Sequence, residues 1–161
     1  MQPRNFLNEP LFAPEHFTEH YALVPFQEER AYLAGVGPSP LQQHREVMLR
    51  KAQKWHDAED LISSFFAKRQ GNKAKPYVLY HMSEWLQMLY WCNQELLSAN
   101  SAWQQQLASF SVTVMNAEER MAVVLAQPHH YIAFVVLREL FLELEKKIAL
   151  LKGKHASLRR Q

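Results

Sequence analysis

The side chains that could do covalent chemistry in this chain are a single cysteine and the histidines. Cys92 would be a nucleophile if an imidazole lay within hydrogen-bonding distance of its sulfur. His81 precedes it by eleven residues, which separates the two by about 16 Å along a helix axis. They cannot pair within one helix, so we expect Cys92 to be a small residue in or near the core.

A metal-binding or enzymatic helical bundle is the third hypothesis for this chain. It would use His81 and Glu84, three residues apart on one predicted helix, and His129 and His130 at the start of another. Di-metal bundles carry Glu-x-x-His on two helices, with further carboxylates facing inward. This chain has one His-x-x-Glu in the opposite order, so we predict no metal site and no cofactor.

The densest acidic cluster comprises His56, Asp57, Glu59 and Asp60. A divalent cation requires more convergent oxygen atoms than this cluster offers, so we expect a solvated helix face with local ion pairs. A glycine-rich phosphate loop, a serine nucleophile elbow and a His-Glu-x-x-His zinc motif are all missing from the sequence. We therefore predict no catalytic residues and favour a binding protein over an enzyme.

Basic residues are concentrated in two segments. Residues 39–75 contain eight Lys or Arg and four acids, and residues 146–161 contain six Lys or Arg and no acid. The helix dipole accounts for cations in a last helical turn but not for Arg159 and Arg160. If the fold brings the two segments together, they form a phosphate-binding patch, which supports a nucleic-acid accessory protein as the second hypothesis. The residues of that patch would be Lys54, Lys68, Arg69, Lys73, Lys75, Arg159 and Arg160.

Helices must position these side chains. Ser39 and Pro40 favour the start of a helix that ends before Gly71, and residues 71–75 read as a linker. Asn116 and Glu119 have the spacing of a capping box. The predicted helices span about 40–70, 76–98, 116–127 and 129–152, with a short helix and extended chain between 98 and 115.

The last predicted helix carries a seam of apolar residues at alternating steps of three and four. Its members are Phe134, Leu137, Phe141, Leu144, Ile148 and Leu151. This spacing is typical of a coiled coil, which packs either within one chain or between two chains. The sequence leaves a homo-oligomer open.

The first 38 residues contain five prolines, two glycines and six aromatic residues, so they cannot form one long helix. We expect an ordered arm at 1–38 packed on a bundle at 39–152, followed by a basic tail at 153–161. Tyr80 and Trp91 lie on the otherwise polar face of the second helix. If the arm covers them they belong to the core, and if they are exposed they mark a protein contact.

Composition is that of a globular protein, with 48% hydrophobic and 21% charged residues. The length of 161 residues suits one domain. A single cysteine fits a reducing compartment, and no segment is apolar enough for a signal peptide or a membrane span. We expect a cytoplasmic protein that does not associate with membranes.

Three stretches carry a resemblance to a known family: LYWCN at 89–93, QPHHYIAF at 127–134 and LFLELEKK at 140–147. In these stretches and their order, the chain resembles the YpoC-like proteins of Gram-positive bacteria. The resemblance implies a small helical protein of bacterial origin and supplies no catalytic residues.

Together these observations predict an all-α bundle of four to five helices with an irregular, proline-rich N-terminal arm. The leading hypothesis is a protein–protein interaction or scaffold module with an unknown protein partner. Its contacts would be Tyr80 and Trp91 or the seam of the last helix.

Overall fold

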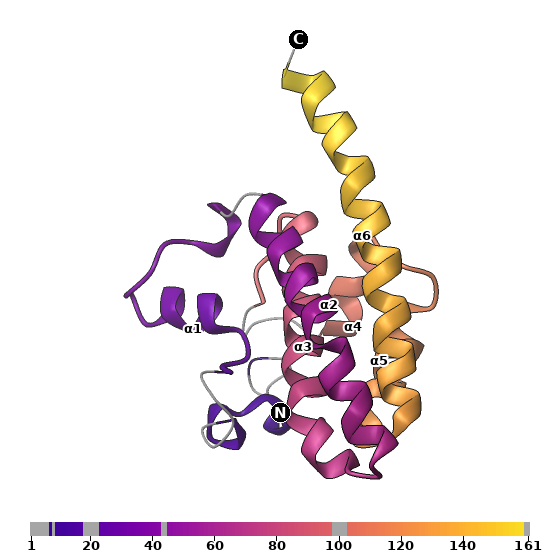
Figure 1. Cartoon of the computed structure of the whole chain (residues 1–161). Helices are drawn as coiled ribbons and strands as arrows, with labels where there is room; N and C mark the ends of the chain where they lie inside the picture. The colour runs from indigo at the N-terminus through magenta and orange to yellow at the C-terminus, as the bar shows by residue number, and fades with distance from the viewer. Residues whose placement is uncertain (1–6, 8, 18–22, 43–44, 98–102, 160–161) are drawn as a thin grey trace.

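The computed structural model describes residues 7, 9–17, 23–42, 45–97 and 103–159, with side chains as far as Leu151. This part of the chain contains six α-helices and no strand, so the predicted all-α fold is confirmed (Figure 1). The helices are α1 (Gln27–Leu33), α2 (Arg45–Ala67), α3 (Gly71–Cys92), α4 (Trp103–Ser109), α5 (Ala117–Ala126) and α6 (Tyr131–Arg159).

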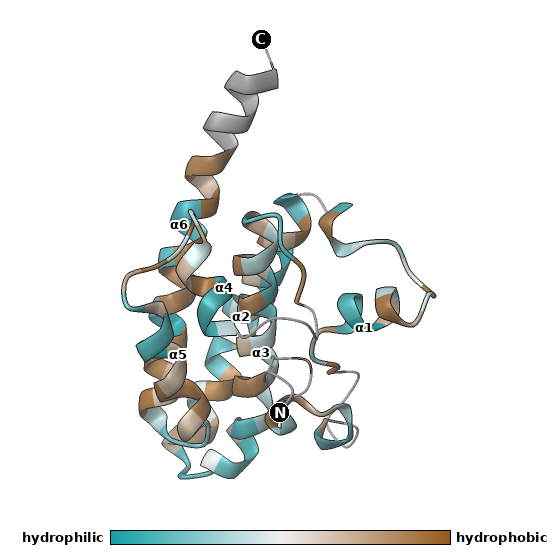
Figure 2. Ribbon diagram, turned by 180° about the vertical axis from the view of Figure 1, so that it is seen from behind, coloured by the Kyte–Doolittle hydropathy of each residue, from teal (hydrophilic) through white to brown (hydrophobic). Residues whose placement is uncertain are grey.

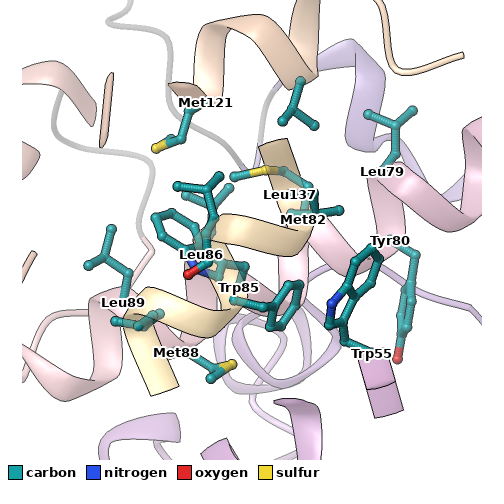
Figure 3. Packing of buried hydrophobic residues seen from close by; sticks show 14 of the residues in the cluster. Trp55, Leu79, Tyr80, Met82, Trp85, Leu86, Met88, Leu89, Met121 and Leu137 are labelled. Carbon is teal, nitrogen blue, oxygen red and sulfur yellow. The ribbon is translucent and has the colours of Figure 1, made fainter. Parts of the chain in front are cut away.

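α3 is the central helix of the bundle. Every residue from Val78 to Trp91 is buried, because α2, α6 and the N-terminal arm cover different sides of the helix. The Trp85 indole N–H donates a hydrogen bond to the Leu140 carbonyl of α6 at 2.9 Å. Figure 3 shows Trp85 among buried residues of α3 and its neighbours, which form the core.

The interface of α2 with α6 is aromatic. Trp55 of α2 stacks on Phe141 of α6, with ring centroids 5.0 Å apart and planes 6° from parallel. Both rings are fully buried, and each large aromatic ring removes about 150–250 Å² from water. This contact positions α2, and with it Lys51 and Lys54, which precede Trp55 by four residues and by one.

The seam of α6 packs inside the monomer. Its residues from Phe134 to Ile148 are at most 1% exposed, and Leu151 is half-buried. The helix lies against α2, α3 and α5 over this length. The spacing also allowed two chains to pair through this seam. The seam residues from Phe134 to Ile148 are already buried within one chain, so they are not available for such pairing.

The start of α3 corrects one prediction. Residues 71–75 are not a linker but the first turn of α3, and Pro76 lies inside the helix. A Cβ atom on Gly71 would lie 2.2 Å from the His129 carbonyl oxygen. Only glycine allows this close approach between the α2–α3 turn and the segment before α6.

The end of α3 also differs from its prediction, at Cys92 instead of about 98. The Asn93 amide donates to the carbonyls of Leu89 and Val112 at 2.8 and 2.7 Å and accepts a hydrogen bond from the Val112 N–H. Its side chain thus terminates the helix and holds the chain that follows α4.

Two further boundaries differ from their predictions, and one predicted cap is not formed although its helix begins where expected. Pro40–Gln42 forms a 3-10 turn, and the α-helix begins at Arg45. Asn116 precedes α5 with a left-handed backbone (φ 54°) and no capping hydrogen bond, so the predicted capping box is wrong. Gly153 does not end α6, which continues to Arg159. The short helix predicted between 98 and 115 is present as α4.

The arm packs on the bundle through apolar side chains. Leu7, Phe12, Phe17 and Phe26 are buried, and Pro10–Phe12 contacts α3. The Arg30 guanidinium donates to the carbonyls of Pro25 and Phe12 at 2.9 and 3.1 Å, which ties α1 to the rest of the arm. In Figure 1, α1 lies beside the bundle, on the side away from α5 and α6.

Candidate functional site

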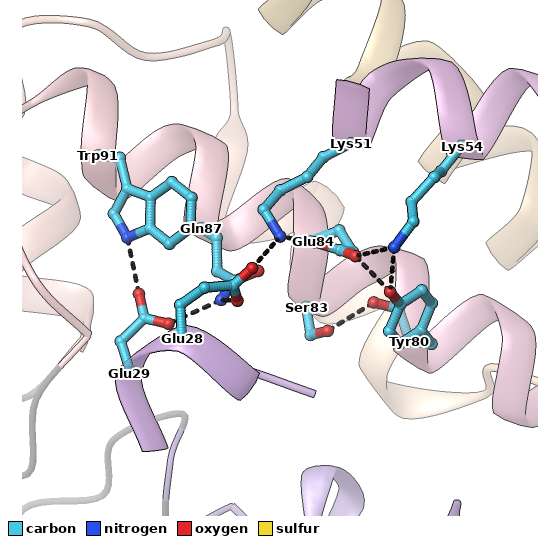
Figure 4. A network of polar contacts seen from close by, with 9 residues as sticks. All are labelled: Glu28, Glu29, Lys51, Lys54, Tyr80, Ser83, Glu84, Gln87 and Trp91. Atoms are coloured by element: carbon cyan, nitrogen blue, oxygen red, sulfur yellow. Dashed lines mark hydrogen bonds and ion pairs between the residues drawn. The ribbon is translucent and has the colours of Figure 1, made fainter. Parts of the chain in front are cut away.

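A network of polar side chains lies beneath α1, where the arm meets the bundle (Figure 4). α3 contributes residues at steps of four, three and four, which fall on one face of a helix. They are Tyr80, Glu84, Gln87 and Trp91. α2 adds Lys51 and Lys54, and α1 adds the adjacent carboxylates of Glu28 and Glu29. We call these eight residues the arm network.

Lys51 is the centre of charge in the arm network. Its ammonium lies 2.8 Å from Glu28 Oε1 and also contacts Glu84 Oε2. Burial alone would lower the pKa of Lys51, but the carboxylates of Glu84 and Glu28 outweigh burial and raise it. Burial likewise opposes ionisation of Glu28, yet Lys51 and the hydrogen bonds hold the pKa of Glu28 below its ordinary value. Both groups are therefore charged at neutral pH.

Lys54 joins the network at its edge. Its ammonium is 2.9 Å from the Tyr80 hydroxyl and 3.5 Å from Glu84 Oε1, while 60% of its side chain remains exposed. The Tyr80 hydroxyl donates a hydrogen bond to Glu84. Burial, together with the Glu84 carboxylate, raises the pKa of Tyr80, so the phenol keeps its proton.

Glu29 has neutral hydrogen-bond partners. The Gln87 amide and the Trp91 indole each donate to its carboxylate at 2.7 Å, and Gln87 also donates to Glu28 at 2.8 Å. Burial raises the pKa of Glu29 to about 7, although both hydrogen bonds act in the opposite direction. Gln87 Oε1 is buried and accepts no hydrogen bond. Glu29 therefore changes charge near neutral pH.

The arm network is built to join protein segments. It sets two lysines against three carboxylates, and most of its polar atoms already have protein partners. Two hollows of the described surface lie elsewhere. One of about 650 Å³ separates α4 from the start of α5, and one of about 400 Å³ lies at the α2–α3 turn.

Residues 45–156 match the model of the YpoC-like protein family, which is 112 of the 161 residues. The chain belongs to the YpoC-like family. The matched part begins at α2 and includes the α2 and α3 members of the arm network, whereas α1 lies outside it. No curated protein and no solved structure is similar enough to match this YpoC-like chain.

Tyr80 and Trp91 are 7% and 3% exposed in this YpoC-like fold. Of the two predictions for these residues, an exposed contact for a partner protein is therefore wrong. The reason is the arm, because α1 brings an acceptor for the Trp91 indole and the Tyr80 hydroxyl finds Glu84 on its own helix. Both residues belong to the covered face of α3.

The basic residues predicted to form one patch are separated. Four of them, Lys68, Arg69, Lys73 and Lys75, lie around the α2–α3 turn, beside the start of α6. Arg159 is 28 residues along α6 from Tyr131, which is about 42 Å at 1.5 Å per residue. Lys54 lies between the two ends, against Tyr80. Arg160 is outside the described residues, and the single patch is not formed.

Arg69 and Lys73 line the hollow at the α2–α3 turn together with His129, which the sequence suggested only for a metal site. Pairing of His129 with His81 is not realised, because His81 is buried in the core against Trp55, with ring centroids 5.4 Å apart. Within the described residues, no group of three or more His, Cys, Asp or Glu could hold a metal ion.

Burial shifts the pKa values of His81 and Cys92 away from neutral pH. It lowers the pKa of His81 to about 3, with Lys54 acting in the same direction, so the imidazole is neutral. It raises the pKa of Cys92 to about 12, so the nucleophilic thiolate is scarce. Cys92 donates its S–H to the Leu89 carbonyl at 3.2 Å.

The acidic cluster on α2 has the exposed acids and the local ion pair that were predicted, and its histidine in addition joins two helices. His56 Nδ1 lies 2.9 Å from Glu59, and His56 Nε2 lies 2.8 Å from Glu145 of α6. Burial acts to lower the pKa of His56, but Glu145 and Glu59 together outweigh burial, so the pKa lies above its ordinary value.

Sequence reasoning missed half of the arm network, and it named Glu84 only as a candidate metal-site residue. The missed residues are Glu28, Glu29, Lys51 and Gln87. One signal pointed to it: Tyr80 and Trp91 are aromatic residues on an otherwise polar face of α3, and such a face needs a cover. The segment that provides the cover, α1, is about sixty residues away in the sequence. Helix periodicity does not encode a contact over such a separation.

No helix in the described part of the chain combines the length and apolar character needed to cross a membrane.

Proposed function

We propose that this YpoC-like chain is a protein–protein interaction or scaffold module that binds its partner through the basic end of α6. One observation carries the proposal. α6 continues as a helix to Arg159, eleven residues beyond Ile148, the last side chain described as buried. That extension is about 16 Å long. In Figure 1 it projects away from the other helices.

The chemistry of the extension indicates the kind of partner. Leu150 is 70% exposed, and Lys146 and Lys147 are exposed beside it. Residues 146–161 contain six Lys or Arg and no acid. A single helix of this length is marginally stable in water, so it gains from packing against another surface. An acidic surface with an apolar strip complements it best.

Affinity capture tests this proposal. The full chain and a chain ending at Leu151 are immobilised and exposed to nuclease-treated lysate of the native cell. We expect an acidic protein on the full chain only, with unchanged helical circular dichroism of the shortened chain. A full-length Lys152→Glu/Lys154→Glu variant should lose the same protein. Equal capture by both lengths would contradict the proposal.

A nucleic-acid accessory role is the second candidate, and the hollow at the α2–α3 turn favours it. Arg69, Lys73 and His129 line this hollow of about 400 Å³. If it binds a phosphate backbone, log affinity falls linearly with log salt, and Arg69→Gln/Lys73→Gln reduces that slope. The absence of binding to single- and double-stranded probes at low salt would reject this candidate.

Either function is compatible with the cytoplasmic location that we infer from the single cysteine.

A further inference from the structure

α1 packs on the bundle with its polar side inward. Its one buried residue is the acid Glu29, while Tyr32, Leu33 and Val36 in and just after the helix are 40%, 61% and 79% exposed. Figure 2 shows the hydrophobic turn of α1 on the side away from the bundle. A helix that belonged permanently to this bundle would bury its apolar side instead. Polar contacts therefore hold α1 in place.

The face beneath α1 is a row of hydrogen-bond donors. Lys51 Nζ, Gln87 Nε2 and Trp91 Nε1 all direct N–H groups at the two adjacent carboxylates of α1, at 2.7–2.8 Å. All three side chains are buried in the presence of α1. Lys51 also lies 5.2 Å from the centroid of the Trp91 ring. This donor face is thus complementary to a helix that carries neighbouring acids.

We infer that the donor face of α2 and α3 is a docking site for an acidic helical segment of a partner protein, and that α1 is its intramolecular occupant. This site is separate from the basic end of α6. The partner segment carries two adjacent carboxylates that take the places of Glu28 and Glu29.

The arm can release α1 without leaving the bundle. Phe12, Phe17 and Phe26 are at most 1% exposed and anchor the chain before α1. Gly35, in a left-handed conformation (φ 76°), lies in the turn that follows α1. The segment between these points is short, so α1 competes at an effective concentration of about a millimolar. A partner that adds apolar contacts, which α1 does not make, displaces it.

A labelled peptide of residues 23–37 provides the probe, because it carries the same two carboxylates as α1. Its binding to the full chain is measured by fluorescence anisotropy, for the natural sequence and for Glu28→Gln/Glu29→Gln. We expect about tenfold tighter binding to the double variant, whose own α1 competes less well. The same peptide with glutamine at both acids should bind about tenfold more weakly.

The matched control is Glu118→Gln/Glu119→Gln, an adjacent pair of exposed acids on α5. It should bind the peptide as the natural chain does. No binding of the peptide to the Glu28→Gln/Glu29→Gln variant would overturn the inference. A dimer with exchanged arms, detected by light scattering, would assign the face to a second copy and overturn it as well.

A second measurement covers the case in which the double variant does not fold. Native-state hydrogen exchange on the natural chain should show that the amides of α1 open locally, at a much lower free energy than those of α3. Protection of α1 equal to that of α3 would mean that α1 leaves only on global unfolding, and would refute the inference.

Discussion

Glu29 is a carboxylic acid held between an amide and an indole inside the protein. Its pKa is about 7 in the folded chain and about 4.5 without these surroundings, so the folded state binds the extra proton between these two pH values. A group with a raised folded pKa contributes stability that is present below the unfolded pKa and is lost as pH rises through the folded pKa. Glu29 therefore favours folding at pH 5 more than at pH 8.

Replacement of Glu29 by glutamine should remove this pH dependence. A glutamine keeps the acceptor for Trp91, and its N–H can reach Gln87 Oε1 if that amide rotates. As pH rises from 4.5 to 8, the natural chain should lose the contribution of Glu29 and the Glu29→Gln chain should not. The unfolding free energy of the variant should therefore rise relative to that of the natural chain by about 3 kcal/mol. Urea titrations at several pH values measure this difference.

The difference between the two proteins isolates Glu29. His56 also has a raised pKa and loses stability in the same direction as pH rises, but it titrates in both proteins. The exposed residue Glu118 is the control, because Glu118→Gln should follow the natural chain. Parallel curves for Glu29→Gln and the natural chain would show that Glu29 is ionised throughout this range.

Lys51 should contribute strongly to stability through its two carboxylate partners. Lys51→Met leaves the buried Glu84 with only the more distant Lys54 and the half-buried Glu28 without an ammonium partner, and breaking a buried ion pair typically costs about 3–5 kcal/mol of unfolding free energy. Adding Glu84→Gln removes one of those charges and should recover part of the loss. A double-mutant cycle by urea unfolding measures the coupling. Additive effects would mean that the two groups do not interact.

At the scale of elements, the α2–α3 turn depends on Gly71. Gly71→Ala would drive a methyl group into the His129 carbonyl oxygen, which is backbone and cannot rotate away. We expect a loss of about 1–3 kcal/mol, as for other overpacked sites, measured by thermal or urea unfolding. Asn72→Ala, at the exposed neighbouring residue, should change stability by less than about 0.5 kcal/mol. Equal effects of the two substitutions would contradict the close approach.

Helix identity was readable from the sequence, but several ends were not. The apolar seam predicted α6, because the positions that pack recur with the helical period. The ends of α3 depend on tertiary contacts instead. A glycine is required at position 71 because the His129 carbonyl lies where a side chain would be. Asn93 ends the helix by hydrogen bonding to Val112, nineteen residues away.

For the whole molecule, the end of α6 should be dispensable for folding. A chain that ends at Leu151 retains every side chain described as buried, so its unfolding free energy should fall by less than about 1 kcal/mol. A chain that ends at Lys147 also lacks the buried Ile148 and should lose about 2–5 kcal/mol. Urea unfolding of the two shortened chains compares them. A large loss on removing residues 152–161 would mean that they pack on the bundle.

The helical period of the apolar residues was enough to predict the all-α fold, and three short stretches carry the resemblance to the YpoC-like family. The local pattern also placed Tyr80 and Trp91 on a polar face of α3, but it left open whether the arm covers them. The tertiary structure was needed to show that Glu28 and Glu29 of α1 cover this face, and that Arg159 lies far along α6 from the basic residues of the α2–α3 turn. Both depend on which distant segments meet. That choice is made by packing of the whole chain, which no local pattern records.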